Sequence, residues 1–172
     1  EDSLNSMIDA LERREREIEV SRQALREKER TLTTLMSNLD GMVYRCRNDA
    51  HWTMEFVSEG CRQLTGYHPE ELLLNSSISF DEVRHPEDRQ RARDEIAAAL
   101  AAKRRFLVEY RIQCRDGAIK WVWERGAGIA DDDGEVVTLE GFIEDITERK
   151  LSMQALQAAE RGFRSIFENS TE

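Results

Sequence analysis

Residues 106–150 decide the fold, and they read FLVEYRIQCRDGAIKWVWERGAGIADDDGEVVTLEGFIEDITERK. Apolar and polar residues alternate in three runs, which are separated by the turn sequences Asp116-Gly117 and Asp131-Asp132-Asp133-Gly134. The runs predict three consecutive antiparallel strands. A helix is predicted directly after the third strand, with Asp145 ending the strand and Thr147 capping the helix. Such a direct connection from strand to helix would couple the edge of a sheet to the segment that follows. This arrangement suits transmission of a structural change better than catalysis.

The first turn sets the expected register of the first two strands. If Asp116-Gly117 is a two-residue turn, Tyr110 lies opposite Trp123 and Ile112 lies opposite Trp121. Tyr110, Trp121 and Trp123 would then share one face of the sheet, where they could line a pocket or simply pack in the core. Glu124 is expected on the other, polar face.

The second turn sets the expected register of the third strand. A three-residue loop with Gly134 in the left-handed conformation would place Trp121 opposite Asp145. The Trp121 indole N–H could then donate to the Asp145 carboxylate, in a hydrogen bond worth about 1.5–3 kcal/mol. We expect Trp121, Asp145 and Thr147 to relay strand movements to the following helix. A plain strand-to-helix junction is the alternative.

Residues 40–105 predict two more strands and several short helices. Alternation of apolar and polar residues predicts strands at Met42–Arg47 and Trp52–Val57. Pro69 and Pro86 each stand where a helix would begin, with acidic residues in its first turn. The second of these helices should run from Pro86 to about Ala102. Antiparallel strands on both sides of a helical block predict an α+β domain.

Residues 4–39 contain neither proline nor glycine and predict one long helix. An apolar residue recurs every seven positions along it, which is the pattern of a coiled-coil seam, at Leu4, Leu11, Ile18, Leu25, Leu32 and Leu39. The second core position of the heptad carries Glu15, Arg22 and Glu29, so the coil should be weak on its own. A parallel homodimer through this seam and a single solvated helix both remain open.

Composition excludes several classes of function. The 172 residues carry a net charge of −10, which argues against nucleic acid as a partner, because phosphate binding needs a basic face. No apolar run approaches the roughly 20 residues of a transmembrane helix, so no membrane contact is expected. The three scattered cysteines form no CxxC pair, which favours a reduced, cytoplasmic setting. No catalytic grouping of nucleophile and base and no metal-ligand spacing stand out, so we expect no enzymatic activity within these residues.

The organisation along the chain predicts three parts. They are a signalling helix at residues 1–39, a globular domain at 40–147 and a linker helix at 148–172. The apolar pattern of residues 29–38 returns at residues 160–169, ending in Asn38 and Asn169 respectively. The linker helix is therefore expected to lead into a second, similar module of a longer protein.

The order of several short motifs resembles a PAS domain over residues 32–150. The motifs are Phe56-Val57-Ser58-Glu59-Gly60, Leu64-Thr65-Gly66-Tyr67, His85-Pro86-Glu87-Asp88, Glu109-Tyr110-Arg111-Ile112, Asp116-Gly117, Trp121-Val122 and Asp145-Ile146-Thr147. The resemblance implies a five-stranded antiparallel sheet with helices across one face, and a sensory or dimerising role in bacterial signalling. Residues 41–49 and 52–57 are similar to PAS domains of cyclic di-GMP enzymes of the GGDEF and EAL classes. The implied output domain is therefore a diguanylate cyclase or phosphodiesterase, with a histidine kinase next. The alternative is a structural dimerisation spacer that binds no ligand.

The resemblance also bears on cofactors. Haem-binding relatives place an axial histidine in the long helix before the hairpin, and residues 86–102 contain none, so haem is disfavoured. Flavin photosensors of the family carry a reactive cysteine in an Asn-Cys-Arg motif. Here Gly60 precedes Cys61, and the position is too early in the chain, so covalent flavin chemistry is disfavoured and Cys61 is expected to be a buried structural cysteine. A non-covalent flavin and a small metabolite stay open.

Overall fold

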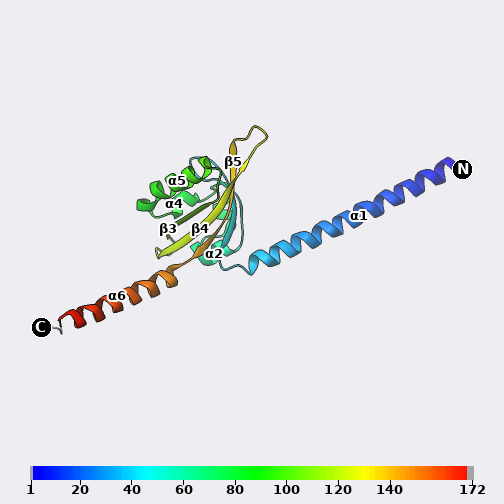
Figure 1. Cartoon of the computed structure of the whole chain (residues 1–172). Helices are drawn as coiled ribbons and strands as arrows, with labels where there is room; N and C mark the ends of the chain where they lie inside the picture. The colour runs from blue at the N-terminus through cyan, green and yellow to red at the C-terminus, as the bar shows by residue number, and fades with distance from the viewer. Residues whose placement is uncertain (1, 170–172) are drawn as a thin grey trace. The chain divides into compact units, whose positions relative to one another are not determined.

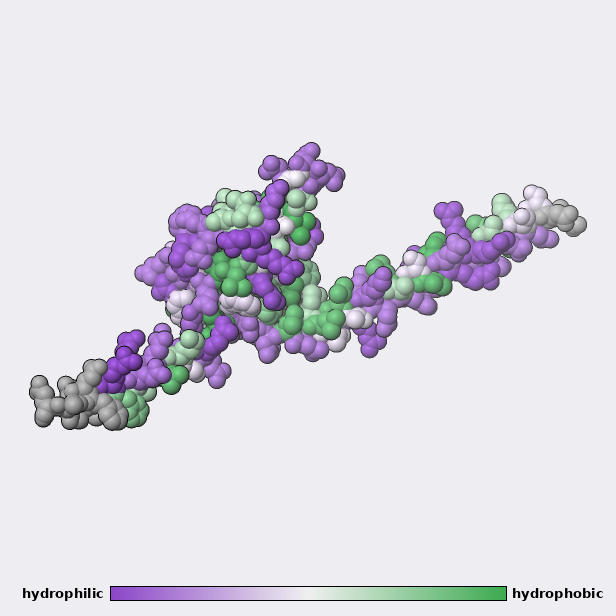
Figure 2. Space-filling model, in the orientation of Figure 1, coloured by the Kyte–Doolittle hydropathy of each residue, from purple (hydrophilic) through white to green (hydrophobic). Residues whose placement is uncertain are grey.

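The computed structural model describes residues 2–169, which divide into two compact units that meet between Asn38 and Leu39. The first unit is α1 (Asp2–Ser37), one uninterrupted helix whose side chains are almost all exposed (Figure 1). Figure 2 shows separate apolar patches spaced along this helix between polar ones. Leu39 lies beyond the end of α1, so the helix carries five of the six predicted seam positions.

The second unit contains a five-stranded antiparallel sheet, as the resemblance predicted. The strand order is β2-β1-β5-β4-β3. The strands are β1 (Met42–Arg47), β2 (Met54–Val57), β3 (Phe106–Gln113), β4 (Ile119–Ala130) and β5 (Val136–Asp145). The helices are α2 (Gly60–Thr65), α3 (Pro69–Leu72), α4 (Phe80–Val83), α5 (Pro86–Ala101) and α6 (Thr147–Asn169). The α+β fold class is confirmed. The last three residues of the predicted linker, 170–172, lie outside the described part of the chain.

The hydrophobic core lies between the sheet and the helices α2–α5, which cover one face of it (Figure 1). Alternate residues of β3 are buried there, including Phe106, Val108, Tyr110 and Ile112. Ile96 and other apolar residues of α5 close the core from the other side. We call this buried side of the sheet the inner face and the opposite side the outer face.

The predicted register of the β3–β4 hairpin is wrong by one residue. Tyr110 lies opposite Val122 rather than Trp123, and Arg111 lies opposite Trp121. The loop has three residues instead of two, because the Cys114 N–H donates to the Ala118 carbonyl at 2.8 Å and Gly117 takes the left-handed conformation at φ 85°. A shift of one residue exchanges the two faces of a strand. Trp121 and Trp123 therefore lie on the outer face, away from Tyr110.

The predicted register of β4 and β5 is also wrong by one residue, although the loop itself is as predicted. The Asp131 N–H donates to the Glu135 carbonyl at 2.9 Å, and Gly134 is left-handed at φ 84°. An irregularity between Ile129 and Ala130 then shifts the pairing, as a β-bulge does. Val122, and not Trp121, consequently lies opposite Asp145.

The buried carboxylate of Asp88 fastens α5 to β3. It accepts hydrogen bonds from the Arg111 backbone N–H at 2.8 Å and from the Arg111 guanidinium at 2.9 Å. These hydrogen bonds lower the pKa of Asp88 from 3.8 to about 2. Because the pKa in the folded state lies below its ordinary value, the stabilisation is fully present above about pH 4 and is lost as the pH falls from there towards 2.

We expect Asp88→Asn to lower the free energy of unfolding at pH 7 by about 1.5–3 kcal/mol, since charge-assisted hydrogen bonds to Arg111 are weakened. Urea unfolding at pH 7, 4 and 3 should show the difference from the wild type shrinking at the lowest pH. Asp94→Asn, an exposed change on the same helix, is the control and should cost little at any pH. A difference that stays constant across this pH range would contradict the assignment.

Candidate functional site

The three residues predicted as pocket candidates do not come together. Tyr110 is fully buried on the inner face, whereas Trp121 and Trp123 are partly exposed on the outer face. The prediction of a shared aromatic pocket is therefore wrong, and its cause is the extra residue in the Arg115-Asp116-Gly117 loop.

The register observed instead places Glu124 in the centre of the core. Its carboxylate accepts hydrogen bonds from the hydroxyls of Tyr44 and Tyr110, the latter at 2.6 Å, and from Arg84 Nη2 at 3.1 Å. The side chains of Arg84 and Glu124 are only 1% and 2% exposed. We call Tyr44, Arg84, Tyr110 and Glu124 the interior cluster. Three donors compensate the buried carboxylate, which would otherwise be very costly.

Arg84 is packed by aromatic rings as well as by Glu124. Its Cζ lies 4.9 Å from the ring centroids of Trp52 and Tyr110 and 5.6 Å from that of Phe80. A guanidinium over aromatic faces gains cation–π attraction. Two of its nitrogens, Nε and Nη1, and the indole Nε1 of Trp52 are buried without a hydrogen-bond partner among residues 2–169. These three nitrogens therefore leave hydrogen-bond donor capacity unused beside the interior cluster.

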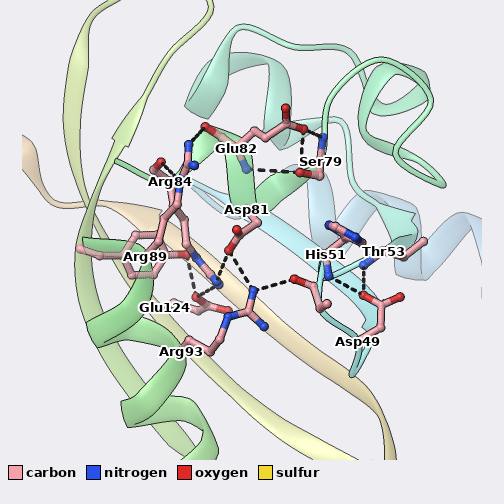
Figure 3. A network of polar contacts seen from close by, with 12 residues as sticks. Asp49, His51, Thr53, Ser79, Asp81, Glu82, Arg84, Arg89, Arg93 and Glu124 are labelled. Carbon is pink, nitrogen blue, oxygen red and sulfur yellow. Dashed lines mark hydrogen bonds and ion pairs between the residues drawn. The ribbon is translucent and has the colours of Figure 1, made fainter. Parts of the chain in front are cut away.

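A chain of polar contacts connects the interior cluster to the β1–β2 loop (Figure 3). Arg84 Nη1 lies 3.8 Å from Asp81 Oδ1, and the same oxygen accepts from Arg93 Nη2 at 3.1 Å. Arg93 in turn donates to the Ala50 carbonyl at 2.8 Å. The path joins the middle of β4 to a loop on the surface through α4 and α5. A displacement of Glu124 can thus reach that loop through directed contacts.

The environment keeps both phenols of the interior cluster neutral. Burial, and then the nearby Glu124 charge, raise the pKa values of Tyr44 and Tyr110 well above 10. The tyrosines therefore remain hydrogen-bond donors at any physiological pH. The only full charges in the interior cluster are Arg84 and Glu124, which form an ion pair.

The sequence interpretation missed this cluster for one reason. A two-residue turn assigns Glu124 to the polar face, whereas a three-residue loop with a left-handed glycine, which Arg115-Asp116-Gly117 also fits, assigns it to the core. The three-residue loop would have placed Glu124 on the inner face, on which Val122 and Gly126 also lie. That placement requires a buried cation, and it would have directed attention to Arg84.

The exit junction between the sheet and α6 is built on the backbone of Trp121. The Ile146 N–H donates to the Trp121 carbonyl at 2.9 Å, and the Trp121 N–H donates to Thr147 Oγ1 at 2.9 Å. Lys150 pairs with Glu109 of β3, and its Nζ lies 5.0 Å from the centroid of the Trp121 ring. The first turn of α6 is therefore attached to both β3 and β4.

Two predicted details of this junction are corrected. The Asp145 carboxylate receives no bond from the Trp121 indole; it accepts from the Thr147 N–H at 2.9 Å and pairs with Lys120 at 3.2 Å. Thr147 begins α6, but its hydroxyl contacts the Trp121 backbone instead of capping the helix. The registers explain both changes, because Trp121 lies one residue away from its expected position opposite Asp145.

The residues present do not fit a flavin photocycle. The Cys61 thiol is buried, as predicted, and donates to the Tyr67 carbonyl at 3.3 Å. Burial and nearby carboxylates raise its pKa to about 12, which disfavours the reactive thiolate.

Two further features bear on the kinds of site present in residues 2–169. No group of three or more histidine, cysteine, aspartate or glutamate side chains in this range is arranged to hold a metal ion. The helices described are also either too short or too polar to span a membrane.

Comparison with known proteins gives the chain its family. The family model described as the PAS fold matches residues 54–143. The methyl sulfide methyltransferase-associated sensor of Methanosarcina acetivorans is 28% identical over 134 residues, which is 77% of this chain and 13% of that protein. A blue-light-activated histidine kinase of Brucella ovis is 28% identical over 167 residues, which is 89% of this chain and 32% of the kinase. The chain thus spans a third or less of the length of these relatives.

Solved structures of PAS-type sensor proteins share the fold of this chain. A sensory box histidine kinase/response regulator from Burkholderia thailandensis superposes with a TM-score of 0.63 at 26% identity, over 78% of this chain and 98% of that chain. The N-terminal domain of a diguanylate cyclase with a PAS/PAC sensor from Marinobacter aquaeolei has a TM-score of 0.55 at 21% identity, over 64% and 98% of the two chains. A light-oxygen-voltage receptor that binds RNA shares the fold, with a TM-score of 0.60 at 19% identity, over 76% of this chain and 36% of that chain. The family match, the sheet order and these superpositions lead to one conclusion: the chain belongs to the PAS family of sensor domains.

Proposed function

We propose that this PAS domain relays an input from its interior through α6 to the output domain of a longer signalling protein. The observation that carries the proposal is the exit junction, in which Ile146 and Thr147 bond the backbone of Trp121. Trp121 stands three residues before Glu124 on the same strand, so a shift of β4 at the interior cluster moves the anchor of α6. A helix held by a strand in this way can adopt a second packing when the strand moves.

The output domain is proposed as a histidine kinase or a diguanylate cyclase or phosphodiesterase. Two similar proteins that name an output, from Brucella ovis and Burkholderia thailandensis, are histidine kinases. The sequence of residues 41–49, which is similar to PAS domains of cyclic di-GMP enzymes, favours a diguanylate cyclase or phosphodiesterase as the output domain. In the proposal, α6 connects the PAS domain to an output domain of either class, so the relay does not depend on which class is present.

The test uses the full-length protein and its output activity. Thr147→Val removes the hydroxyl that bonds Trp121 while keeping the shape of the side chain, and it should change the basal output by about fivefold or more if the junction carries allosteric coupling. Ser152→Ala, an exposed change on the same helix, is the control and should leave the output unchanged. The urea midpoint of each variant separates a relay defect from simple loss of stability.

A structural dimerisation spacer is the second candidate function. It shares the fold and the exit junction but requires no coupling between them. If Thr147→Val leaves the output of a well-folded protein unaltered, the spacer becomes the better description and the relay is rejected.

We propose that the protein acts as a homodimer through α1. The support is the row of seam residues, each about half exposed on the helix: Leu4, Leu11, Ile18, Leu25 and Leu32. Apolar residues in heptad register are normally buried by a second helix. Leu25→Glu should therefore convert a dimer to a monomer in sedimentation experiments, whereas Val20→Glu, an exposed apolar position outside the seam, should not. A wild type that sediments as a monomer at high concentration would exclude this dimer.

The proposed input is a small polar molecule that supplies an acceptor to Arg84 and Trp52, and the proposed location is the cytoplasm. Cys46, Cys61 and Cys114 are all free and buried, which suits a reducing compartment. Light-oxygen-voltage domains among the similar structures keep a flavin among the candidates. The absorption spectrum of the purified protein decides this point, because a bound flavin absorbs in the blue and a small metabolite does not.

A further inference from the structure

The outer face of the sheet carries a groove that shares only Tyr44 with the interior cluster and none of the residues of the exit junction. Its volume is about 550 Å³, which lies within the range of small-molecule sites. Its apolar lining comes from β1, β2, β4 and β5 and includes Val43, Phe56, Ala127 and Phe142. Phe56 is 41% exposed, so an aromatic ring is presented to solvent at the groove.

Two arginines at this groove have no acidic partner. Arg105 and Arg125 both line it, and no ion pair joins either of them to an acidic side chain in the described part of the chain. By contrast, Arg45 at the same groove pairs with Glu140 at 2.9 Å. Among residues 2–169, Glu140 is the one carboxylate that lines the groove, and its pair with Arg45 leaves Arg105 and Arg125 without a counter-charge of their own.

The register places these two arginines close together. Leu107 lies opposite Arg125, and the same register continued by two residues sets Arg105 opposite Ala127. Arg105 directly precedes β3 and Arg125 lies on β4, so the two arginines line the same groove from neighbouring parts of the sheet. Like charges in such positions repel each other, which an anion between them would offset.

The small side chain of Ala127 leaves the space beside the arginines open. Its neighbours across β5 are Glu140 directly opposite and Phe142 on the adjacent pair, which lies opposite Arg125. A flat apolar body can thus rest against Phe142 and Phe56 while its charged end reaches the guanidinium groups. Aromatic contact and a charge-assisted hydrogen bond would act together on one molecule.

We propose that this groove is a binding site for an aromatic anion, held by Arg105 and Arg125 at its charged end and by Phe56 and Phe142 along its ring. Neither Arg84 nor Trp52 lines this groove, so it is distinct from the proposed input site. If the groove binds no ligand, the proposed relay through α6 still stands.

The test measures binding of 2-naphthoate, an aromatic carboxylate, to the whole chain by isothermal titration calorimetry. The double variant Arg105→Gln/Arg125→Gln should weaken binding at least about tenfold, since it removes both charge-assisted contacts. Ala127→Leu should weaken it comparably by filling the groove while leaving the charges in place. The uncharged 2-naphthamide, which has the same ring, should bind the wild type at least about tenfold more weakly than the carboxylate.

The matched control is Arg62→Gln/Arg149→Gln, which removes two exposed arginines that do not line the groove and changes the net charge equally. It should leave the affinity for 2-naphthoate unchanged. Equal loss in both double variants would reveal general charge attraction and overturn the proposal, as would equal binding of 2-naphthamide. If the groove variants alter sedimentation but not naphthoate binding, the face is a contact between copies of this chain and the ligand site is rejected.

Discussion

Replacing Glu124 with leucine should lower the free energy of unfolding by about 3–5 kcal/mol, because it leaves the Arg84 guanidinium buried without its counter-charge. The same change removes the acceptor of the Tyr44 and Tyr110 hydroxyls, which lie in the core with no access to water. Urea unfolding followed by circular dichroism measures the loss. A cost of this size makes Glu124→Leu the most damaging substitution we expect in the strands.

The double variant Arg84→Met/Glu124→Leu separates the ion pair from simple packing. Removing both charges should recover much of the stability lost in Glu124→Leu, since apolar replacements of a buried pair are often close to neutral. Glu140→Gln, which breaks the exposed pair with Arg45, is the control on the same sheet and should cost no more than about 1 kcal/mol. If the double variant is as unstable as the single one, the buried charge is not the cause.

The recovered double variant also allows a test of input. Its interior is expected to be folded and uncharged, so it lacks the guanidinium that would meet a polar ligand. A full-length protein with this interior should keep its basal output and lose its response to the ligand. The buried charges would then serve recognition rather than stability.

Sequence periodicity predicted the elements of this fold well. The strand at Met42–Arg47 and the helix beginning at Pro86 lie where expected, because a period of two residues or a proline followed by acids is a local signal. The helix of residues 4–39 ends two residues earlier than expected, at Ser37. Local patterns thus define where each element lies.

Register was less accessible, because it depends on single residues in the turns. One additional residue in the loop at Gly117 moved Trp121, Trp123 and Glu124 to the opposite faces from those predicted, and one bulge at Ile129 placed Val122 instead of Trp121 opposite Asp145. Both alternatives satisfy the same alternation along β4, so the pattern cannot distinguish them. Only the requirement that the buried Arg84 find a carboxylate selects the correct one, and that is a tertiary constraint.

The structure also brings the entry and the exit of the PAS domain together. Met42, at the start of β1, lies opposite Ile143, close to the end of β5. Gly41 and Asp145 line the same small hollow, together with Gly60 at the start of α2. A change in how the chain enters β1 can therefore reach the junction with α6 over a short distance.

Gly60→Ala is expected to disrupt the contact between the start of α2 and the start of β1. It should lower the free energy of unfolding by about 3 kcal/mol or more, because Gly60 is packed against the backbone of Gly41. A Cβ at Gly60 would overlap the Gly41 carbonyl oxygen and lie 2.8 Å from its carbonyl carbon. Carbon atoms normally approach no closer than about 3.5 Å. The start of β1 would have to move, and with it the reciprocal hydrogen bonds of Val43 with the Ser58 N–H and hydroxyl, each 2.9 Å long.

Gly162→Ala is the matched control, because a Cβ at Gly162 on α6 would meet nothing within 4 Å. Alanine favours a helix over glycine by about 0.5–1 kcal/mol, so this change should leave stability unaltered or raise it slightly. Hydrogen exchange of the β1 amides should accelerate in Gly60→Ala and not in Gly162→Ala. Equal exchange in the two variants would mean that β1 adjusts to the added methyl group at no cost, and the proposed close link between entry and exit would lose its physical basis.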